Sequence, residues 1–273
     1  MKWLLLGFLL AANLAAWQSV FLNHKSSFIN PVFYFLDVGQ GDSQLIDFGP
    51  AEILIDGGSD ARVLGQLEKI LGPTDRYLDL VILTHPELDH FGGLIDVLER
   101  YEVGKFIDNG RQGPARAYKN LPEADLILAE GDKIHYKDYE IKILNPSPEN
   151  INSEKLNDTS IVALLESPGL KVLYTGDIGF KVEDQIRKKY KLAVDILKVP
   201  HHGSKNSSGA KFLNEINPAV AVIGVGKNSY GHPNPKALER LGQAGATIYT
   251  TLDNGLIKLE VDKNRNLNVF SEK

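Results

Sequence analysis

Residues 83–93 read L-T-H-P-E-L-D-H-F-G-G and place two histidines and two carboxylates within six positions, directly after an apolar segment. His85, Glu87, Asp89 and His90 carry side chains of the types that bind divalent cations. The chain contains no cysteine, so any metal must be held by His, Asp and Glu. The alternative interpretation is a polar loop that caps a helix. The rest of the chain decides between the two.

Histidine is concentrated at the ends of the predicted strands. Five of the seven histidines lie at such ends beside glycine or proline, and only His24 and His135 do not. Asp177 follows another strand after Gly176, and Asp158 opens a further one. Loops at sheet edges, held by a rigid scaffold, commonly carry binding and catalytic residues. This distribution favours a metal site over a helix-capping loop.

The opening segment has a geometry that suits ligands. Alternate residues of an extended segment share one side, so we expect His85, Glu87 and Asp89 to face the same way. His90 then turns with the start of a helix, and Gly92-Gly93 allow a close approach of backbone. Such a loop can serve two cations roughly 3.5–4 Å apart.

The elements that must position these residues follow from short β-rich runs and a few amphipathic segments. Glycine turns separate the first three strands as in a meander, and later strands alternate with helices. We expect strands at 32–37, 43–48, 52–56, 78–84, 133–135, 139–144, 161–166, 171–175, 194–199, 219–225, near 248 and at 256–260, with helices at 61–71, 94–100, 182–190 and 236–242. This order predicts two packed sheets with helices outside, an αββα sandwich.

Composition excludes one class of function. The net charge is −5 and the pI is near 5.8, which argues against a protein that coats nucleic acid through bulk electrostatics. One dense basic stretch covers residues 187–191. We interpret it as a solvated helix end, with a contact to a polyanionic substrate as the alternative.

The N-terminus differs from the remainder. Residues 3–22 carry no charge, and Lys2 precedes them. As a helix they would span the roughly 30 Å hydrocarbon core of a bilayer. We expect 1–24 to be a transmembrane anchor, with a cleaved signal peptide as the alternative, followed by a connector at 25–30 and one folded domain at 31–273. The single positive charge before the segment places that domain outside the cytoplasm, or the protein is secreted if the segment is cleaved.

Taken together, the motifs resemble a known family. H-x-E-x-D-H at 85–90 is similar to the H-x-H-x-D-H motif of the metallo-β-lactamase fold, with Glu87 in place of the second histidine. A narrower set resembles the hydrolase domain of ComEC-type DNA-internalisation (competence) proteins, in order from about residue 32 to 260. It comprises D-V-G-Q-G-D-S at 37–43, L-I-D-G-G at 54–58, N-D-T-S at 157–160, T-G-D at 175–177, L-K-V-P-H-H-G-S at 197–204 and N-S-Y-G-H-P at 228–233.

The resemblance implies a two-metal hydrolase. His85, Glu87 and Asp158 would bind the first metal, with Asp158 in the place where many relatives have a third histidine. Asp89 and His90 would bind the second metal, and Asp177 would bridge the pair. One of His201, His202 and His232 would complete the second site and another would act as general acid, with His202 and His232 as the leading candidates. The residues implied as catalytic are therefore Asp89, Asp177, His201, His202 and His232.

A second group of residues is expected to support the ligands or touch substrate. Asp37, Asp42 and Asp56 would stabilise loops, and Asp56 is the best candidate for a hydrogen bond to a ligand. Asn157 belongs to the same group. Ser204 and Lys205 would contact a phosphate oxygen, with a turn-forming role for Ser204 and solvent exposure for Lys205 as the alternatives.

The two carboxylates that replace imidazoles make the first site harder and more anionic. Oxygen ligands suit Mn²⁺ or Mg²⁺, whereas imidazole-rich sites suit Zn²⁺. We therefore expect two divalent ions, Mn²⁺ or Zn²⁺, with Mg²⁺ as a further candidate.

The resemblance implies a phosphodiesterase or nuclease that acts on DNA, in DNA uptake, and we expect it to act outside the cytoplasm. The chain has one long apolar segment and no channel, so it would act with a separate DNA-translocation channel protein or independently. Two alternatives stay open. One is a phosphodiesterase or esterase acting on cell-envelope material, because this fold hosts many substrates. The other is a catalytically silent binding module.

Overall fold

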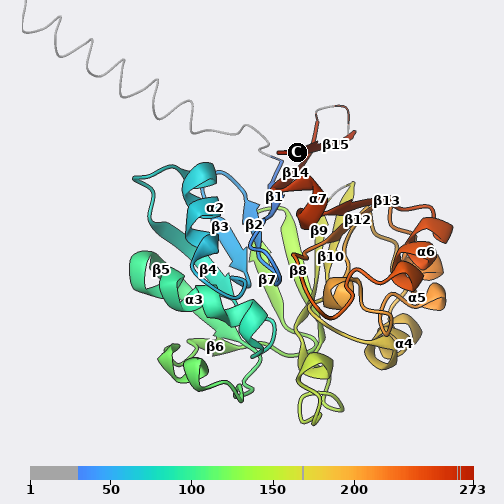
Figure 1. Ribbon diagram of the computed structural model, residues 1–273, viewed down its shortest axis with the longest axis horizontal. Helices are drawn as coiled ribbons and strands as arrows, with labels where there is room; N and C mark the ends of the chain where they lie inside the picture. Colours follow the sequence, from blue (N-terminus) through green and yellow to red (C-terminus); the bar gives the residue numbers. More distant parts are fainter. Residues whose placement is uncertain (1–29, 168, 263, 265) are drawn as a thin grey trace, which may run out of the picture.

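Two β-sheets packed face to face, with helices on both outer sides, make up the described part of the protein (Figure 1). The computed structural model describes residues 30–167, 169–262, 264 and 266–273. The αββα sandwich expected from the sequence is confirmed for these residues. The predicted N-terminal hydrophobic helix lies outside them. None of the helices in the described ranges has the length and apolarity needed to cross a membrane.

The first sheet has eight strands in the order β15-β14-β1-β2-β3-β4-β5-β6. Neighbours from β15 to β3 run antiparallel, and those from β3 to β6 run parallel. Its strands are β1 (Val32–Phe35), β2 (Gln44–Asp47), β3 (Glu52–Ile55), β4 (Tyr77–Ile82), β5 (Glu102–Asp108), β6 (Leu126–Ile127), β14 (Ile257–Val261) and β15 (Leu267–Ser271).

The second sheet repeats this plan with seven strands in the order β13-β12-β11-β10-β9-β8-β7. Here β7 to β10 are antiparallel, and β10 to β13 are parallel. Its strands are β7 (Lys133–Tyr136), β8 (Tyr139–Asn145), β9 (Val162–Ser167), β10 (Leu170–Tyr174), β11 (Ile196–Lys198), β12 (Val220–Ile223) and β13 (Thr247–Thr250).

Helices cover the outer face of each sheet. The helices are α2 (Arg62–Leu71), α3 (Leu88–Arg100), α4 (Phe180–Lys189), α5 (Ala210–Ile216), α6 (Pro235–Gln243) and α7 (Thr251–Asn254), with 3-10 turns η1 (Arg116–Asn120), η2 (Leu156–Thr159) and η3 (Pro200–Gly203). Figure 1 shows α2 and α3 beside the first sheet, and α4 to α6 beside the second.

Strand alternation divides the apolar side chains among three cores. Phe33 and Phe35 of β1 are fully buried in the core between the sheets. Leu45 and Leu54 point the other way and pack with the apolar face of α2. The outer face of the second sheet packs against α4, α5 and α6 in a third core. Burying one large apolar side chain contributes roughly 1.5–3 kcal/mol to the stability of the fold. The three cores therefore stabilise the strands and helices that carry the loops.

One expected element needs correction, and several elements were not predicted. The helix predicted at 94–100 begins at Leu88, so Asp89 lies in its first turn and not on an extended segment with His85 and Glu87. β5 was missed because Gly104 interrupts its pattern, although a side chain at 104 would lie 2.6 Å from the Asp79 carbonyl oxygen of β4. The sequence also failed to indicate β6, α5, α7 and β15.

The basic stretch at 187–191 has structural partners. Arg187 and Lys188 form ion pairs with Asp184, and Lys189 pairs with Glu130 on a neighbouring loop. These contacts favour the interpretation of the stretch as a solvated helix end.

Candidate metal centre

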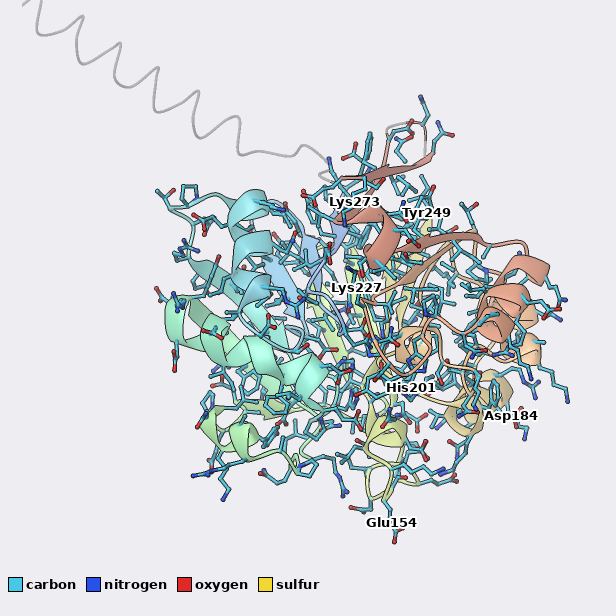
Figure 2. The ribbon with its side chains drawn as sticks, viewed as in Figure 1. Glu154, Asp184, His201, Lys227, Tyr249 and Lys273 are labelled. Atoms are coloured by element: carbon cyan, nitrogen blue, oxygen red, sulfur yellow. The ribbon has the colours of Figure 1, made fainter. Side chains whose placement is uncertain are left out.

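Loops from both halves of the chain meet at the seam between the sheets. Asp42 lies in the loop between β1 and β2, and His85 to His90 follow β4. Asp177 follows β10, and His201-His202 follow β11. In Figure 2, His201 lies near the middle of the view, between the helices that cover the first sheet and those that cover the second. The carboxyl ends of parallel strands thus deliver ligand-type residues from both sheets to one place.

Four of these residues form a tight cluster of potential ligands. Asp42, His90, Asp177 and His202 each offer one ligand atom, these atoms lie within 4.8 Å of one another, and all four residues are buried. Asp177 is the common neighbour of the two imidazoles. Its Oδ1 lies 3.4 Å from His90 Nε2, and its Oδ2 lies 3.4 Å from His202 Nε2.

Asp89 reaches the same cluster from the first turn of α3. Its Oδ2 lies 3.3 Å from His202 Nε2. Gly92 and Gly93 let α3 approach closely, because a Cβ on either would lie 2.1 Å from a backbone oxygen of residues 57–59. The close approach expected at these glycines is therefore confirmed.

Hydrogen bonds fix which nitrogen of each imidazole in the first half faces the cluster. Thr84 Oγ1 donates to Asp56 at 2.8 Å, so it accepts the bond from His85 Nδ1 at 3.1 Å. His90 Nδ1 donates to Asp56 Oδ2 at 2.8 Å, the same oxygen that accepts from Thr84 Oγ1. Both rings therefore hold a proton on Nδ1, and the free Nε2 of His90 faces Asp177 in the cluster.

His202 is oriented in the same way from the second half. Its Nδ1 donates to the Gly224 carbonyl oxygen at 2.7 Å, which leaves Nε2 facing Asp89 and Asp177. His201 and His202 have φ values of 52° and 49°, a left-handed conformation that costs an ordinary residue roughly 1–2 kcal/mol. Backbone strain of this kind tends to persist at functional sites.

The cluster fits a divalent cation. In the cluster, His90 Nε2, His202 Nε2 and Asp177 Oδ1 are buried and have no hydrogen-bond partner among the described residues. The same holds for Nε2 of the neighbouring His85, whose ring lies 4.1 Å from that of His90. Leaving a buried polar atom unpaired costs about 1–3 kcal/mol, and here several such atoms converge. Imidazole nitrogens and carboxylate oxygens are ligands for Mn²⁺, Zn²⁺ and related ions.

Electrostatics within the cluster agree with this assignment. Burial raises the pKa of Asp177, but His202, His90 and Lys198 outweigh it and hold that pKa well below its usual range. Burial lowers the pKa of His202, whereas Asp177 and Asp42 outweigh it and raise the pKa to about 9. The carboxylates therefore create a strongly cation-attracting environment.

Lys198 is a member of this site that sequence reasoning missed. It is 1% exposed at the end of β11, and its ammonium forms an ion pair with Asp42. The ammonium also donates to the Gly176 carbonyl oxygen at 2.8 Å and lies 3.5 Å from Asp177 Oδ1. Burial lowers the pKa of Lys198, but Asp42 and Asp177 outweigh it and raise the pKa, so the side chain stays charged. The available signal was a lysine inside an otherwise apolar strand, separated from the histidine pair only by Val199 and Pro200.

Other predicted site residues lie apart from the cluster. Glu87 is partly exposed, and its Oε2 lies 3.9 Å from His85 Nε2. Asp158 Oδ2 accepts a hydrogen bond from Ser153 Oγ at 3.1 Å and lies 3.6 Å from the Lys181 ammonium. Neither belongs to the group of converging ligands found among the described residues. The structure thus brings together the residues proposed for the second metal more closely than those proposed for the first.

The remaining supporting residues divide by position. Asp42 lies inside the cluster, and Asp56 holds His90 as described. Asp37 instead accepts from Gly39 N and contacts Lys273 at the surface. Asn157 lies in η2, where its carbonyl oxygen accepts from Ser160 N.

Ser204 and Lys205 follow the histidine pair but have different surroundings. Ser204 is buried and forms turn hydrogen bonds with His201 and Ser207, in agreement with the turn-forming alternative. Lys205 is exposed, in agreement with the solvent-exposed alternative.

A pocket of about 360 Å³ opens over the cluster. It is lined by Gln40, Ser59, Glu87, Leu88, Asp89, Asp177, His201, His202, Tyr230 and His232. The rings of His201 and His232 lie 5.5 Å apart, nearly perpendicular. Burial lowers the pKa of both side chains, so both are neutral at pH 7 and can accept a proton.

Asp56 supplies the first prediction. Asp56→Asn is expected to weaken Mn²⁺ binding by about 10–100-fold, since a neutral amide cannot accept the bonds of both Thr84 and His90 as the carboxylate does. Asparagine tolerates the φ of 59° at this position, so the backbone is retained. Titration calorimetry measures the affinity, and Asp47→Asn is the control, because this carboxylate at the end of β2 accepts from Gly49 N outside the cluster. Unchanged affinity in a folded Asp56→Asn protein would contradict this role.

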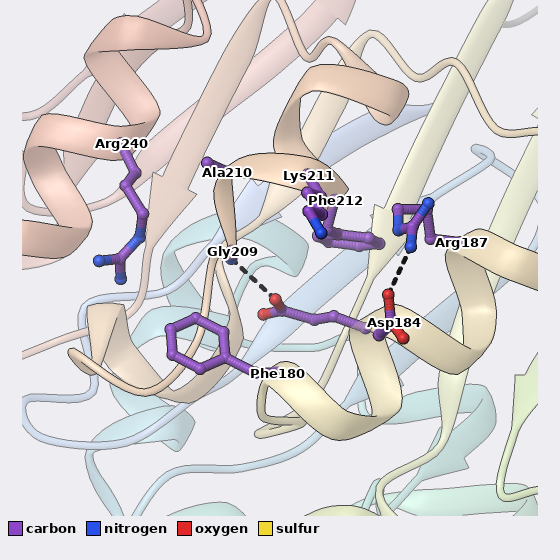
Figure 3. A pocket seen from close by; sticks show the side chains of 9 residues that line it. Phe180, Asp184, Arg187, Gly209, Ala210, Lys211, Phe212 and Arg240 are labelled. Carbon is purple, nitrogen blue, oxygen red and sulfur yellow. Dashed lines mark hydrogen bonds and ion pairs between the residues drawn. The ribbon is translucent and has the colours of Figure 1, made fainter.

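A second pocket, of about 330 Å³, lies among α4, α5 and α6 (Figure 3). Glu183 is 1% exposed there and accepts hydrogen bonds from Ser208 N and Gly209 N. Arg240 donates to the carbonyl oxygens of Ser207 and Ser208 and lies over the ring of Phe180. These contacts fix the segment that follows the histidine pair, so this pocket has a supporting role.

Glu183 makes stability depend on pH. Burial raises its pKa from about 4.5 to about 7, although the two backbone N–H groups act in the opposite direction. The folded state therefore binds the proton more tightly than the unfolded state, and the free energy of unfolding falls as pH rises from about 4.5 to about 7. Glu183→Gln is expected to reduce the fall between pH 5 and pH 8 by about 1–3 kcal/mol.

Urea unfolding at the two pH values measures this difference. Glu239→Gln, an exposed change on α6, is the matched control and should leave the fall unaltered. An equal pH dependence in the Glu183→Gln and natural proteins would show that Glu183 does not titrate in this range.

Comparison with known proteins supports the fold. Residues 36–227 match the model of the Metallo-beta-lactamase superfamily. The chain is 31% identical over 257 residues to ComE operon protein 3 of Bacillus subtilis, covering 84% of this chain and 33% of that protein. It is 31% identical over 220 residues to Competence protein ComA of Neisseria gonorrhoeae, covering 79% of this chain and 30% of that protein. The chain thus spans about a third of the length of these relatives.

A solved structure shows the same fold. Igni18, a metallo hydrolase from Ignicoccus hospitalis, superposes with a TM-score of 0.57 at 17% identity, covering 85% of this chain and all of that one.

Proposed function

Since this chain belongs to the metallo-β-lactamase superfamily, we propose that it is a metal-dependent phosphodiesterase that cleaves DNA. The observation that carries the proposal is the convergence of His90, His202 and Asp89 on Asp177, with unpaired buried ligand atoms facing one another. Its similarity to competence proteins supports DNA as the substrate.

In this proposal, one group of residues binds metal and a second group transfers protons. Asp89, His90, Asp177 and His202 would hold a divalent ion, Mn²⁺ or Zn²⁺ with Mg²⁺ as the weaker candidate, and His85 with Glu87 would hold a second one. A bound divalent ion supplies positive charge that lowers the pKa of water and stabilises charge on a phosphoryl oxygen.

The protein's own contribution is orientation and the control of protons. Asp56 and the Gly224 carbonyl oxygen hold His90 and His202 with Nε2 toward the cluster, so little reorganisation is needed when substrate binds. His201 and His232 line the pocket as neutral bases. Either can take a proton from attacking water and return it to the leaving oxygen.

The test uses the purified full chain after removal of metal. Mn²⁺, Zn²⁺ or Mg²⁺ is added to end-labelled single- and double-stranded DNA and, separately, to a small phosphodiester. Metal-dependent cutting of DNA would support the proposal. Hydrolysis of the small phosphodiester beside intact DNA would contradict DNA as the substrate and favour the second candidate.

The second candidate is a phosphodiesterase or esterase acting on cell-envelope material. The net charge of −5 favours it, because the surface lacks the excess of positive charge typical of nucleic-acid binders. A protein that binds neither Mn²⁺ nor Zn²⁺ would instead be a catalytically silent binding module.

The setting of the reaction is part of the same proposal. We place the domain outside the cytoplasm, attached by a membrane anchor at 1–24, and working with a separate DNA-translocation channel protein. Cell fractionation with a protease-accessibility assay tests this location.

A further inference from the structure

Two exposed apolar side chains border the pocket over the metal centre. Tyr230 is 73% exposed and Leu88 is 48% exposed, and both line the same pocket as Asp89, Asp177 and His202. Exposed side chains of this size contribute little to a core. Because they border a pocket lined by ligand-type residues, we infer that these two side chains contact the molecule that enters the pocket.

The segment that carries Tyr230 is held firmly by one side chain. The Asn228 amide donates to the carbonyl oxygens of Gly226 and His232 at 2.8 and 2.7 Å. Its Oδ1 accepts from Tyr230 N and His232 N at 3.0 and 3.1 Å. All four hydrogen bonds available to an amide are used within this segment. Tyr230 is thus presented on an ordered support beside His232.

The tyrosine ring continues a row of rings that leads into the pocket. Its centroid lies 6.1 Å from that of His232, with an angle of 35° between the planes. The His232 ring lies 5.5 Å from that of His201. Tyr230 is 73% exposed, and its hydroxyl has no hydrogen bond within the described ranges. A flat apolar face is therefore offered to solvent at the mouth of the pocket.

We propose that Tyr230 is a stacking subsite for an unpaired nucleobase next to the scissile phosphate. The inference rests on the proposed nuclease function and specifies its substrate as single-stranded nucleic acid. Base faces in a duplex are covered by their neighbours, whereas a base in a single strand can stack on an aromatic side chain. Such stacking needs no positively charged surface, which agrees with the acidic composition of the chain.

The experiment compares two single strands that differ in their bases. One end-labelled oligonucleotide carries all its bases, and the other has abasic residues around the cleaved position. Both are cleaved by the full chain with Mn²⁺ as the natural protein, Tyr230→Ala, Tyr230→Phe and Phe270→Ala. Phe270, 50% exposed on β15, is the matched control for loss of an exposed aromatic ring elsewhere.

The stacking subsite predicts a specific pattern. Tyr230→Ala should reduce kcat/KM on the complete strand by about 5–150-fold, mainly through KM, which corresponds to about 1–3 kcal/mol of stacking per base. The natural protein should lose a similar factor on the abasic strand, and Tyr230→Ala should lose little more there. Tyr230→Phe and Phe270→Ala should retain the natural rate on the complete strand.

Other outcomes overturn the inference in distinguishable ways. Equal cleavage of the two strands by the natural protein, or loss of activity in Tyr230→Phe as large as in Tyr230→Ala, excludes stacking while the nuclease function stands. Failure of the natural protein to cleave either strand overturns the proposed function and this inference with it.

Discussion

Asp177→Asn is expected to reduce metal-dependent phosphodiester cleavage by at least about 1,000-fold, the largest effect of any single substitution. Asp177 is the residue that both buried imidazoles share, since its two carboxylate oxygens lie 3.4 Å from His90 Nε2 and His202 Nε2. Asparagine keeps the size of the side chain but removes the charge and one potential ligand oxygen. The loss should therefore fall on both cation affinity and rate.

The measurement is the initial rate on the preferred phosphodiester at saturating Mn²⁺. Calorimetry of Mn²⁺ binding on the same proteins separates loss of the ion from loss of turnover. Asp184→Asn removes a carboxylate from the surface of α4, outside the metal centre, and serves as the matched control. An Asp177→Asn protein within tenfold of the natural rate would exclude Asp177 from the metal centre.

Lys198→Met is expected to destabilise the protein by about 3–5 kcal/mol, the largest expected effect on stability. The substitution removes the ammonium that pairs with Asp42 and leaves that carboxylate fully buried. A buried charge without its partner carries most of its desolvation cost. Urea unfolding of the metal-free protein measures the change.

A double-mutant cycle tests whether the loss belongs to the pair. Asp42→Asn removes the charge that Lys198→Met leaves without a partner and keeps nearly the same shape. Asparagine is chosen because Gly224 packs tightly against Asp42 Oδ1, so the replacement must have the size of aspartate. The double variant Asp42→Asn/Lys198→Met should therefore recover much of the stability that Lys198→Met loses. If the two single losses simply add in the double variant, the pair does not act as a unit.

The sequence predicted the sandwich and most of its elements because their signals are local. Short apolar runs between glycine turns marked the strands, and residues at their ends marked the site. The start of α3 was predicted too late because Pro86-Glu87-Leu88 carries no apolar period, although the chain already turns there. Asp89 consequently lies in the first turn of α3, and its carboxylate contacts His202 from that helix.

The parts of the site that were missed depend on contacts between distant segments. Asp42 was expected to support a loop, but the packing of the two sheets places it beside Lys198, a residue more than a hundred positions later. Sequence spacing cannot report such a contact. Conversely, Asp158 was predicted from a motif alone, and its bond with Ser153 and proximity to Lys181 follow from the local path of the chain around η2.

The origin of the ligands on both sides of the seam has a consequence for the kinetics of folding. Asp89 and His90 come from the first half of the chain, whereas Asp177 and His202 come from the second. A complete cation site therefore exists only after the two sheets have docked, so the ion gains little from partly docked states. An ion that binds only the finished structure slows unfolding and leaves the folding rate nearly unchanged. In a chain without cysteine, a bound cation would then take the place of a crosslink between the halves and extend the lifetime of the native state.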